Sequence, residues 1–257
     1  MPRFSTLALA LLFALPLSAA GEAPVATILC YHEVDAAPAH QTIPRRSASG
    51  DATSERLRYT ATPEQFREEL DYLEQHDYHV IALADLVDFL EGRRASLPAK
   101  AVVITVDDGW LCAYTEIFPE LRRRKMPWTL FVYPKIVGRG EHAVTWAQVA
   151  EMAQAGVDVE SHTYTHPFLT QTNDLDHELA ESRKTIEEKS GASVRFLSYP
   201  YGDYDPTVMV AAEAAGYEAA VTTRRAPIAP STSPLALTRY LIHNDTTIEE
   251  FRTFLLR

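Results

Sequence analysis

Short apolar runs alternate with amphipathic segments along most of the chain from residue 25 onward. The apolar runs predict strands at 25–31, 101–106, 129–133, 157–160, 196–199, 218–222 and 237–242. The segments between them, where apolar positions recur at helical spacing, predict helices at 63–75, 83–91, 111–124, 145–155, 175–189, 206–215 and 248–255. This alternation is typical of βα units around a parallel sheet. We therefore expect an α/β fold in one domain, a distorted (β/α)7-type barrel that is closed or nearly closed.

The first residues of the chain have a different pattern. A basic start at Arg3 precedes an apolar run at 7–17 and the small residues 18–21. This order predicts a secretory signal peptide at 1–22 and a folded domain at 23–257. A membrane anchor is the alternative, but the run is shorter than the roughly 20 apolar residues of a spanning helix. We expect export to the periplasm or the cell exterior, without stable membrane insertion once the signal is cleaved.

Residues 35–59 also break the alternation. They are rich in Ala, Ser, Pro and Arg without a clear period, which predicts a long loop. The formal net charge of -11 argues against nucleic acid as a partner, because phosphate binding needs a basic surface. In an oxidising compartment Cys30 and Cys112 would be either one disulfide or two buried free thiols.

Carboxylates and histidines follow two of the predicted strands. Asp107 and Asp108 come directly after the buried run 102–106, and adjacent carboxylates are usually held by a cation or a hydrogen-bond network, although Asp and Gly109 also build ordinary turns. His162 and His166 lie four residues apart after the run 157–160. Function collects where parallel strands end, so Asp108, His162 and His166 are candidate metal ligands that leave positions for water and substrate.

A third strand, at 196–199, ends in Pro200-Tyr201-Gly202, a turn whose backbone N–H groups are suited to an oxyanion. These three elements, in this order, resemble the polysaccharide deacetylases with a NodB homology domain, carbohydrate esterase family four. The matching motifs are Thr105-Val106-Asp107-Asp108-Gly109, His162-Thr163-Tyr164-Thr165-His166 and Pro200-Tyr201. The resemblance spans residues 28–254, and Tyr31-His32-Glu33 is similar to the exported branch that acts on poly-N-acetylglucosamine.

The resemblance implies a role for each matching residue. Asp107 would be the general base, and Asp108, His162 and His166 would hold a divalent metal, with zinc expected and other transition metals open. The backbone N–H of Tyr201 would stabilise the tetrahedral oxyanion. No organic cofactor is needed, and the partner would be a polysaccharide substrate.

The chain departs from the family pattern at three places. Ser198 stands where the family has an arginine, two residues before the proline. Arg195 and Arg239 are candidate replacements for that arginine, and we expect Arg239 to be the one that orients Asp107. The family has a motif with an aspartate and a tryptophan that lines the acetyl pocket, but no tryptophan follows Tyr201 in this chain. Trp110 or Trp146 would have to replace it, and packing is the simpler role for Trp146. The general acid is expected at His32, with His243 of Ile242-His243 as the alternative.

The resemblance predicts a hydrolase of carbon–nitrogen bonds other than peptide bonds, which removes N-acetyl groups from an N-acetylglucosamine polymer. Three alternatives remain open: an O-acetyl esterase on a xylan-like glycan, an amidase on a small cyclic or formylated compound, and a carbohydrate-binding relative without activity. Export argues against the amidase. The presence of Asp107 beside three metal-ligand candidates argues against the binding protein.

Overall fold

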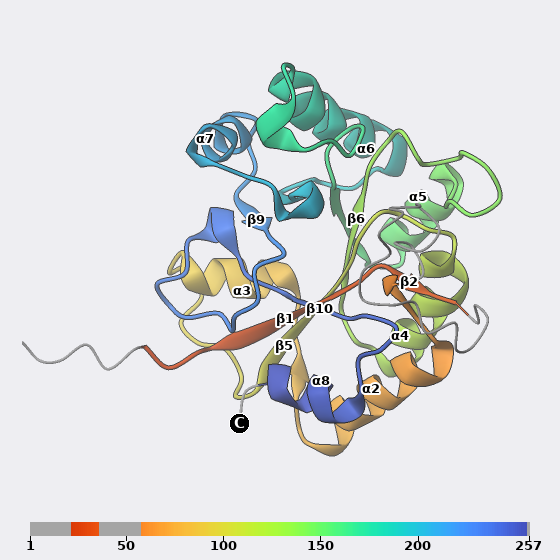
Figure 1. The fold of residues 1–257 in the computed structure, drawn as a ribbon, viewed down its shortest axis with the longest axis vertical. Helices are drawn as coiled ribbons and strands as arrows, with labels where there is room; N and C mark the ends of the chain where they lie inside the picture. Colours follow the sequence, from red (N-terminus) through yellow and green to blue (C-terminus); the bar gives the residue numbers. More distant parts are fainter. Residues whose placement is uncertain (1–21, 36–57, 256–257) are drawn as a thin grey trace, which may run out of the picture.

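A curved sheet of parallel strands forms the centre of the molecule and helices cover its outside (Figure 1). The structure is a computed structural model and describes residues 22–35 and 58–255. The predicted signal peptide, except for Glu22, and most of the predicted loop 35–59 lie outside the described residues. None of the described helices combines the length and apolar character needed to cross a membrane.

Strand order in the main sheet is β10-β1-β5-β6-β7-β8-β9, and β4 also pairs with β5. All of these pairs are parallel. The strands of this sheet are β1 (Ala26–Tyr31), β4 (His79–Val80), β5 (Ala101–Val106), β6 (Thr129–Val132), β7 (Asp158–Ser161), β8 (Phe196–Ser198), β9 (Ala219–Val221) and β10 (Tyr240–Leu241). β4 was not predicted, and neither was a separate pair of strands, β2 (Glu33–Val34) and β3 (Thr60–Ala61).

The helices agree with the predicted segments, with two corrections. They are α2 (Pro63–Gln75), α3 (Leu83–Leu90), α4 (Phe118–Arg124), α5 (Trp146–Gln154), α6 (Ser182–Ser190), α7 (Pro206–Ala214) and α8 (Ile248–Phe254). The predicted helices 111–124 and 175–189 each contain a π turn near their start, at Ala113–Ile117 and His177–Glu181. Pro119 explains the first, because it has no N–H for the carbonyl four residues earlier and its ring crowds that turn.

The barrel closes through the segment that was predicted as one strand at 237–242. Its first part bonds to β9, where the N–H of Leu237 donates to the carbonyl of Ala220 at 2.9 Å. Its second part, β10, pairs with β1, with Tyr240 opposite Leu29. The regular strand is therefore shorter than predicted, because this segment changes partners midway. The outcome is a distorted barrel in a single domain, as the sequence predicted.

Alternation along the strands determines which side chains enter the barrel. On β5, Val102 and Ile104 pack outward against helices, whereas Val103 packs inward with α3. Because successive side chains point to opposite faces of a strand, Thr105 and Asp107 continue the inward row. The same parity places Ser198 of β8 on the inside, two residues after the inward Phe196.

Candidate active site

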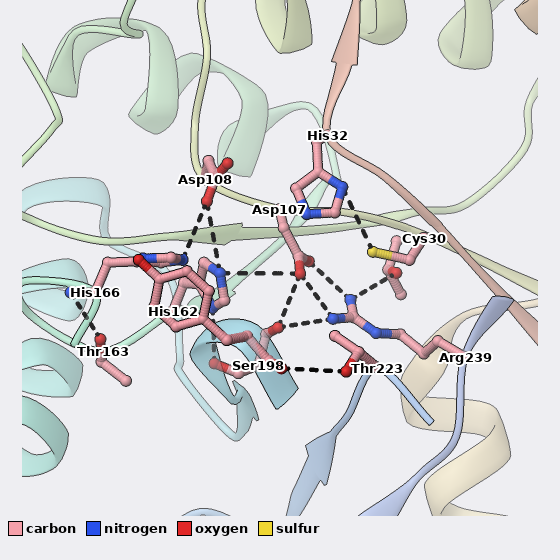
Figure 2. A network of polar contacts seen from close by, with 12 residues as sticks. Cys30, His32, Asp107, Asp108, His162, Thr163, His166, Ser198, Thr223 and Arg239 are labelled. Atoms are coloured by element: carbon pink, nitrogen blue, oxygen red, sulfur yellow. Dashed lines mark hydrogen bonds and ion pairs between the residues drawn. The ribbon is translucent and has the colours of Figure 1, made fainter. Parts of the chain in front are cut away.

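Every residue to which the sequence analysis gave a catalytic or metal-binding role lines one cavity of about 540 Å³ at the carboxyl ends of the strands. These residues are His32, Asp107, Asp108, His162, His166, Tyr201, Arg239 and His243. They come from segments that follow β1, β5, β7 and β8 and from the closing segment around β10. Figure 2 shows how the side chains of His32, Asp107, Asp108, His162, His166 and Arg239 lie. The structure brings all of them together, while their chemical roles remain predictions.

Asp107 and Arg239 form a buried bidentate ion pair at the base of this cavity. Nη1 of Arg239 donates to Oδ1 of Asp107 at 2.8 Å, and Nη2 donates to Oδ2 at 2.7 Å. Two more N–H groups donate to the hydroxyls of Thr105 and Ser198, and Nε donates to the carbonyl of Thr222. All five guanidinium donors thus have an acceptor, which a buried charge requires.

This environment keeps Asp107 ionised. Burial alone raises the pKa of a carboxyl group, but the Arg239 guanidinium outweighs it and holds the pKa of Asp107 well below its ordinary value. The hydroxyl of Ser198 donates a further bond to Asp107 at 2.9 Å. Arg195 lies elsewhere and pairs with Glu218. Arg239 therefore contacts Asp107 as the sequence hypothesis expected.

Asp108, His162 and His166 form a group that suits a metal ion. Nε2 of His162 and Nε2 of His166 lie 3.5 and 3.6 Å from Oδ1 of Asp108, and one ligand atom of each residue lies within 4.8 Å of the others. Nδ1 of His162 lies 2.7 Å from the carbonyl of Ser198, which acts as its acceptor and leaves Nε2 as the free lone pair. Two imidazoles and a carboxylate are a frequent catalytic zinc set.

Burial has opposite effects on the two kinds of ligand candidate: it favours the metal-binding neutral form of the histidines but opposes ionisation of the aspartate. It lowers the pKa of His162 to about 3 and lowers the pKa of His166, so both imidazoles stay neutral. It raises the pKa of Asp108, for which the indole N–H of Trp110 supplies a partner at 2.9 Å. Trp110 therefore holds the second carboxylate oxygen while the first faces the histidines.

The backbone around these residues is strained. Asp108, Thr163, His166 and Tyr201 have φ angles of 79°, 65°, 63° and 60°. Left-handed backbone is costly for a β-branched residue such as Thr163, and such strain concentrates at functional sites. The loop is held by Glu178, whose carboxylate accepts bonds from the N–H groups of Tyr164 and Thr165.

Both candidates for the general acid face the cavity. His32 and His243 each lie against the ring of Tyr59, at centroid distances of 4.8 and 5.3 Å. Burial lowers the pKa of both histidines. Nε2 of His243 is buried and has no hydrogen-bond partner among residues 22–35 and 58–255.

Some residues at the site were missed or left open by the sequence analysis. Tyr133 was missed, and its ring centroid lies 5.2 Å from that of His166. It directly follows β6, so the expectation that functional residues collect where parallel strands end could have identified it. Trp146 packs against the hydrophobic core. Cys30 and Cys112 are buried free thiols, so the disulfide alternative is not observed. Sγ of Cys30 lies 4.0 Å from Nδ1 of His32.

The ion pair predicts how stability depends on pH. Replacing Asp107 with Asn leaves Arg239 buried without its counter-ion, so we expect a loss of about 3 kcal/mol in the free energy of unfolding at pH 7. Because the folded pKa of Asp107 is depressed, its stabilisation is present above about pH 4 and is lost as pH falls further. The difference between wild type and Asp107→Asn should therefore shrink toward pH 3.

Denaturant unfolding from pH 7 to pH 3, with chelator present, measures this difference. Asp176→Asn is the matched control, because Asp176 is exposed and should change stability by less than about 0.5 kcal/mol. If the difference in the free energy of unfolding between wild type and Asp107→Asn did not change with pH, the depressed pKa of Asp107 in the folded protein would be contradicted.

Trp110 should influence metal affinity through its bond to Asp108. Trp110→Phe keeps the ring but removes the indole N–H, and we expect zinc to bind about tenfold more weakly. Competition with a chromophoric chelator measures the affinity, with Trp146→Phe as the control outside the site. Equal affinities for wild type and Trp110→Phe would show that this bond does not position a metal ligand.

Comparison with known proteins places this site in a family. A family model described as polysaccharide deacetylase matches residues 94–220, which include both aspartates and both histidines of the centre. YxkH of Bacillus subtilis, assigned to the polysaccharide deacetylases, is 36% identical over 126 residues, which are 48% of this chain and 45% of YxkH. The chain thus matches less than half the length of that relative.

Other relatives match more of the chain. The poly-beta-1,6-N-acetyl-D-glucosamine N-deacetylase of Staphylococcus epidermidis is 26% identical over 214 residues, 76% of this chain and 73% of that protein. The structure of IcaB from Ammonifex degensii has a TM-score of 0.74 at 27% identity and covers 90% of this chain and 95% of its own. Streptococcus pyogenes deacetylase PplD shares the fold, with a TM-score of 0.77 at 22% identity over 92% of this chain and 100% of its own. The chain therefore belongs to the polysaccharide deacetylase family of hydrolases.

Proposed function

We propose that this protein is an exported, metal-dependent enzyme that removes N-acetyl groups from an N-acetylglucosamine polymer. One observation carries the proposal: an ionised carboxylate, Asp107, lies beside a three-ligand metal group in a single cavity. Oδ2 of Asp107 is 3.9 Å from Nε2 of His162. A protein that only binds carbohydrate has no use for a base held in this position.

The donor set fits a divalent transition metal, and we propose zinc held by Asp108, His162 and His166. When bound there, the metal would supply Lewis acidity toward the acetyl carbonyl oxygen and the attacking water.

Asp107 is the proposed general base. Arg239 keeps it ionised at neutral pH, so it is ready to accept a proton from the water that attacks the acetyl carbon. Arg239 and Ser198 also restrict the orientation of the carboxylate, which limits the reorganisation needed during the reaction.

Two further groups are proposed to stabilise the oxyanion and to protonate the leaving amine. The backbone N–H of Tyr201 is proposed to donate to the tetrahedral oxyanion, and the turn is held by a 3.2 Å bond from Thr223 to the carbonyl of Tyr201. His32 is the proposed acid that protonates the amine nitrogen as its bond to the acetyl carbon breaks. His32 is preferred to His243 because a ring nitrogen of His32 lies within 4.8 Å of a carboxylate oxygen of Asp107, the proposed base.

The substrate and the location of the enzyme are inferences from other proteins and from the sequence. The name of the Staphylococcus epidermidis relative supports an N-acetylglucosamine polymer as substrate. The pattern of residues 1–22 supports export through a signal peptide.

Acetate release from β-1,6- and β-1,4-linked N-acetylglucosamine oligomers tests the proposal. The zinc-loaded protein should release acetate from at least one linkage, and chelation or Asp107→Asn should reduce the rate by at least about 100-fold. Acetate released only from acetylated xylan would favour an O-acetyl esterase. No release from any substrate by folded, zinc-bound protein would overturn the proposed activity.

The general acid can be identified with two substrates that differ in leaving group. His32→Gln should lower the rate of amide deacetylation by about 100-fold, because the amine must be protonated as it leaves. Hydrolysis of an aryl acetate should change little in this variant, since its leaving group needs no acid. His243→Gln is the matched comparison, and if it gave the selective loss while His32→Gln did not, His243 would be the acid.

A further inference from the structure

Two aromatic side chains are exposed beside the metal group. Phe168 and Tyr201 are 44% and 51% exposed, and with Val210 of α7 they are the large hydrophobic residues that stand out from the surface in the described part of the chain. Burial of a phenylalanine side chain is favourable, so an exposed one that is held in place is informative. We call Phe168 and Tyr201 the aromatic rim.

The aromatic rim extends from the metal group of Asp108, His162 and His166 toward the protein surface. The ring of Tyr201 meets that of His166 edge to face at 4.7 Å. Tyr201 also stacks on Phe168, with ring centroids 4.1 Å apart and an interplanar angle of 14°. Tyr201 lines the cavity, whereas Phe168 lies beyond its lining residues. The row therefore leads from a metal-ligand candidate to the protein surface.

The loops that carry the aromatic rim are fixed to each other. Leu169, next to Phe168, is buried in the core. Thr170 donates from its N–H to Oδ2 of Asp203 at 2.8 Å, and its hydroxyl also bonds to that carboxylate. Asp203 lies two residues after Tyr201, so this contact joins the loop after β7 to the turn after β8. The loop that carries Phe168 is thus held in place, and the exposed position of the Phe168 side chain follows from these contacts.

We propose that the aromatic rim is a carbohydrate subsite for a second sugar ring of the glycan, next to the one whose acetyl group is removed. The C–H face of a pyranose is apolar and slightly positive, and it is complementary to the negative face of an aromatic ring. The continuity of Phe168 with Tyr201 identifies the occupant as part of the same substrate chain. This inference rests on the proposed deacetylase function.

The subsite predicts a dependence on substrate length. Phe168→Ala should lower kcat/KM about five- to tenfold on N-acetylglucosamine oligomers long enough to reach the rim, by raising KM without changing kcat. Hydrolysis of a single N-acetylglucosamine unit or of an aryl acetate should stay within about twofold of wild type. Phe168→Tyr keeps an aromatic face and should restore the kinetics on long oligomers.

Kinetics on an oligomer series from one to six units measures these effects, with the zinc-loaded full chain. Val210→Ala is the control for loss of an exposed apolar side chain outside the site, and it should behave as wild type on every substrate. If the wild type is active but Phe168→Ala lowers the rate equally at all lengths, or not at all, the subsite is refuted while the deacetylase function stands. If the wild type itself releases no acetate from any oligomer, the proposed function fails first.

Discussion

The buried pair of Arg239 and Asp107 joins the architecture of this protein to its chemistry. Arg239 lies on the segment that closes the barrel, and its donors reach Asp107 after β5, Ser198 of β8 and Thr222 after β9. A guanidinium buried in this way is tolerated only when its donors are satisfied, so the strands must meet for the charge to be accommodated. The closed barrel and the ionised state of Asp107 therefore depend on the same set of contacts.

Ser198 connects this pair to the metal group. Its hydroxyl contacts Asp107 and Arg239, and its carbonyl accepts from Nδ1 of His162. The side chain is fully buried, so an arginine at this position would compete with Arg239 for the same space. The serine at 198 and the arginine at 239 are therefore compatible as a set: the guanidinium reaches Asp107 from another strand of the barrel.

Rings form two rows at the cavity, and each row suits a different task. The row of His32, Tyr59 and His243 contains two half-buried imidazoles, which are the two candidates for the general acid. The row of His166, Tyr201 and Phe168 begins at a metal-ligand candidate and ends in exposed aromatic surface suited to a sugar ring. Proton transfer would need a titratable ring beside the reacting atoms, whereas recognition of an extended glycan would need aromatic surface that stays open to solvent. The division of the rings meets both requirements.

Local patterns in the sequence determined most of the parallel strands, most helices and the placement of Asp107, Asp108, His162 and His166 at strand ends, because each depends on residues within a few positions. Sequence did not reveal the π turns, the change of partners around Leu237 or the exposure of Phe168, whose residue type ordinarily predicts burial. The contact of Arg239 with Asp107 spans 132 positions and was only a hypothesis from sequence. Tertiary structure decided these features, because barrel closure determines which inward side chains share one space.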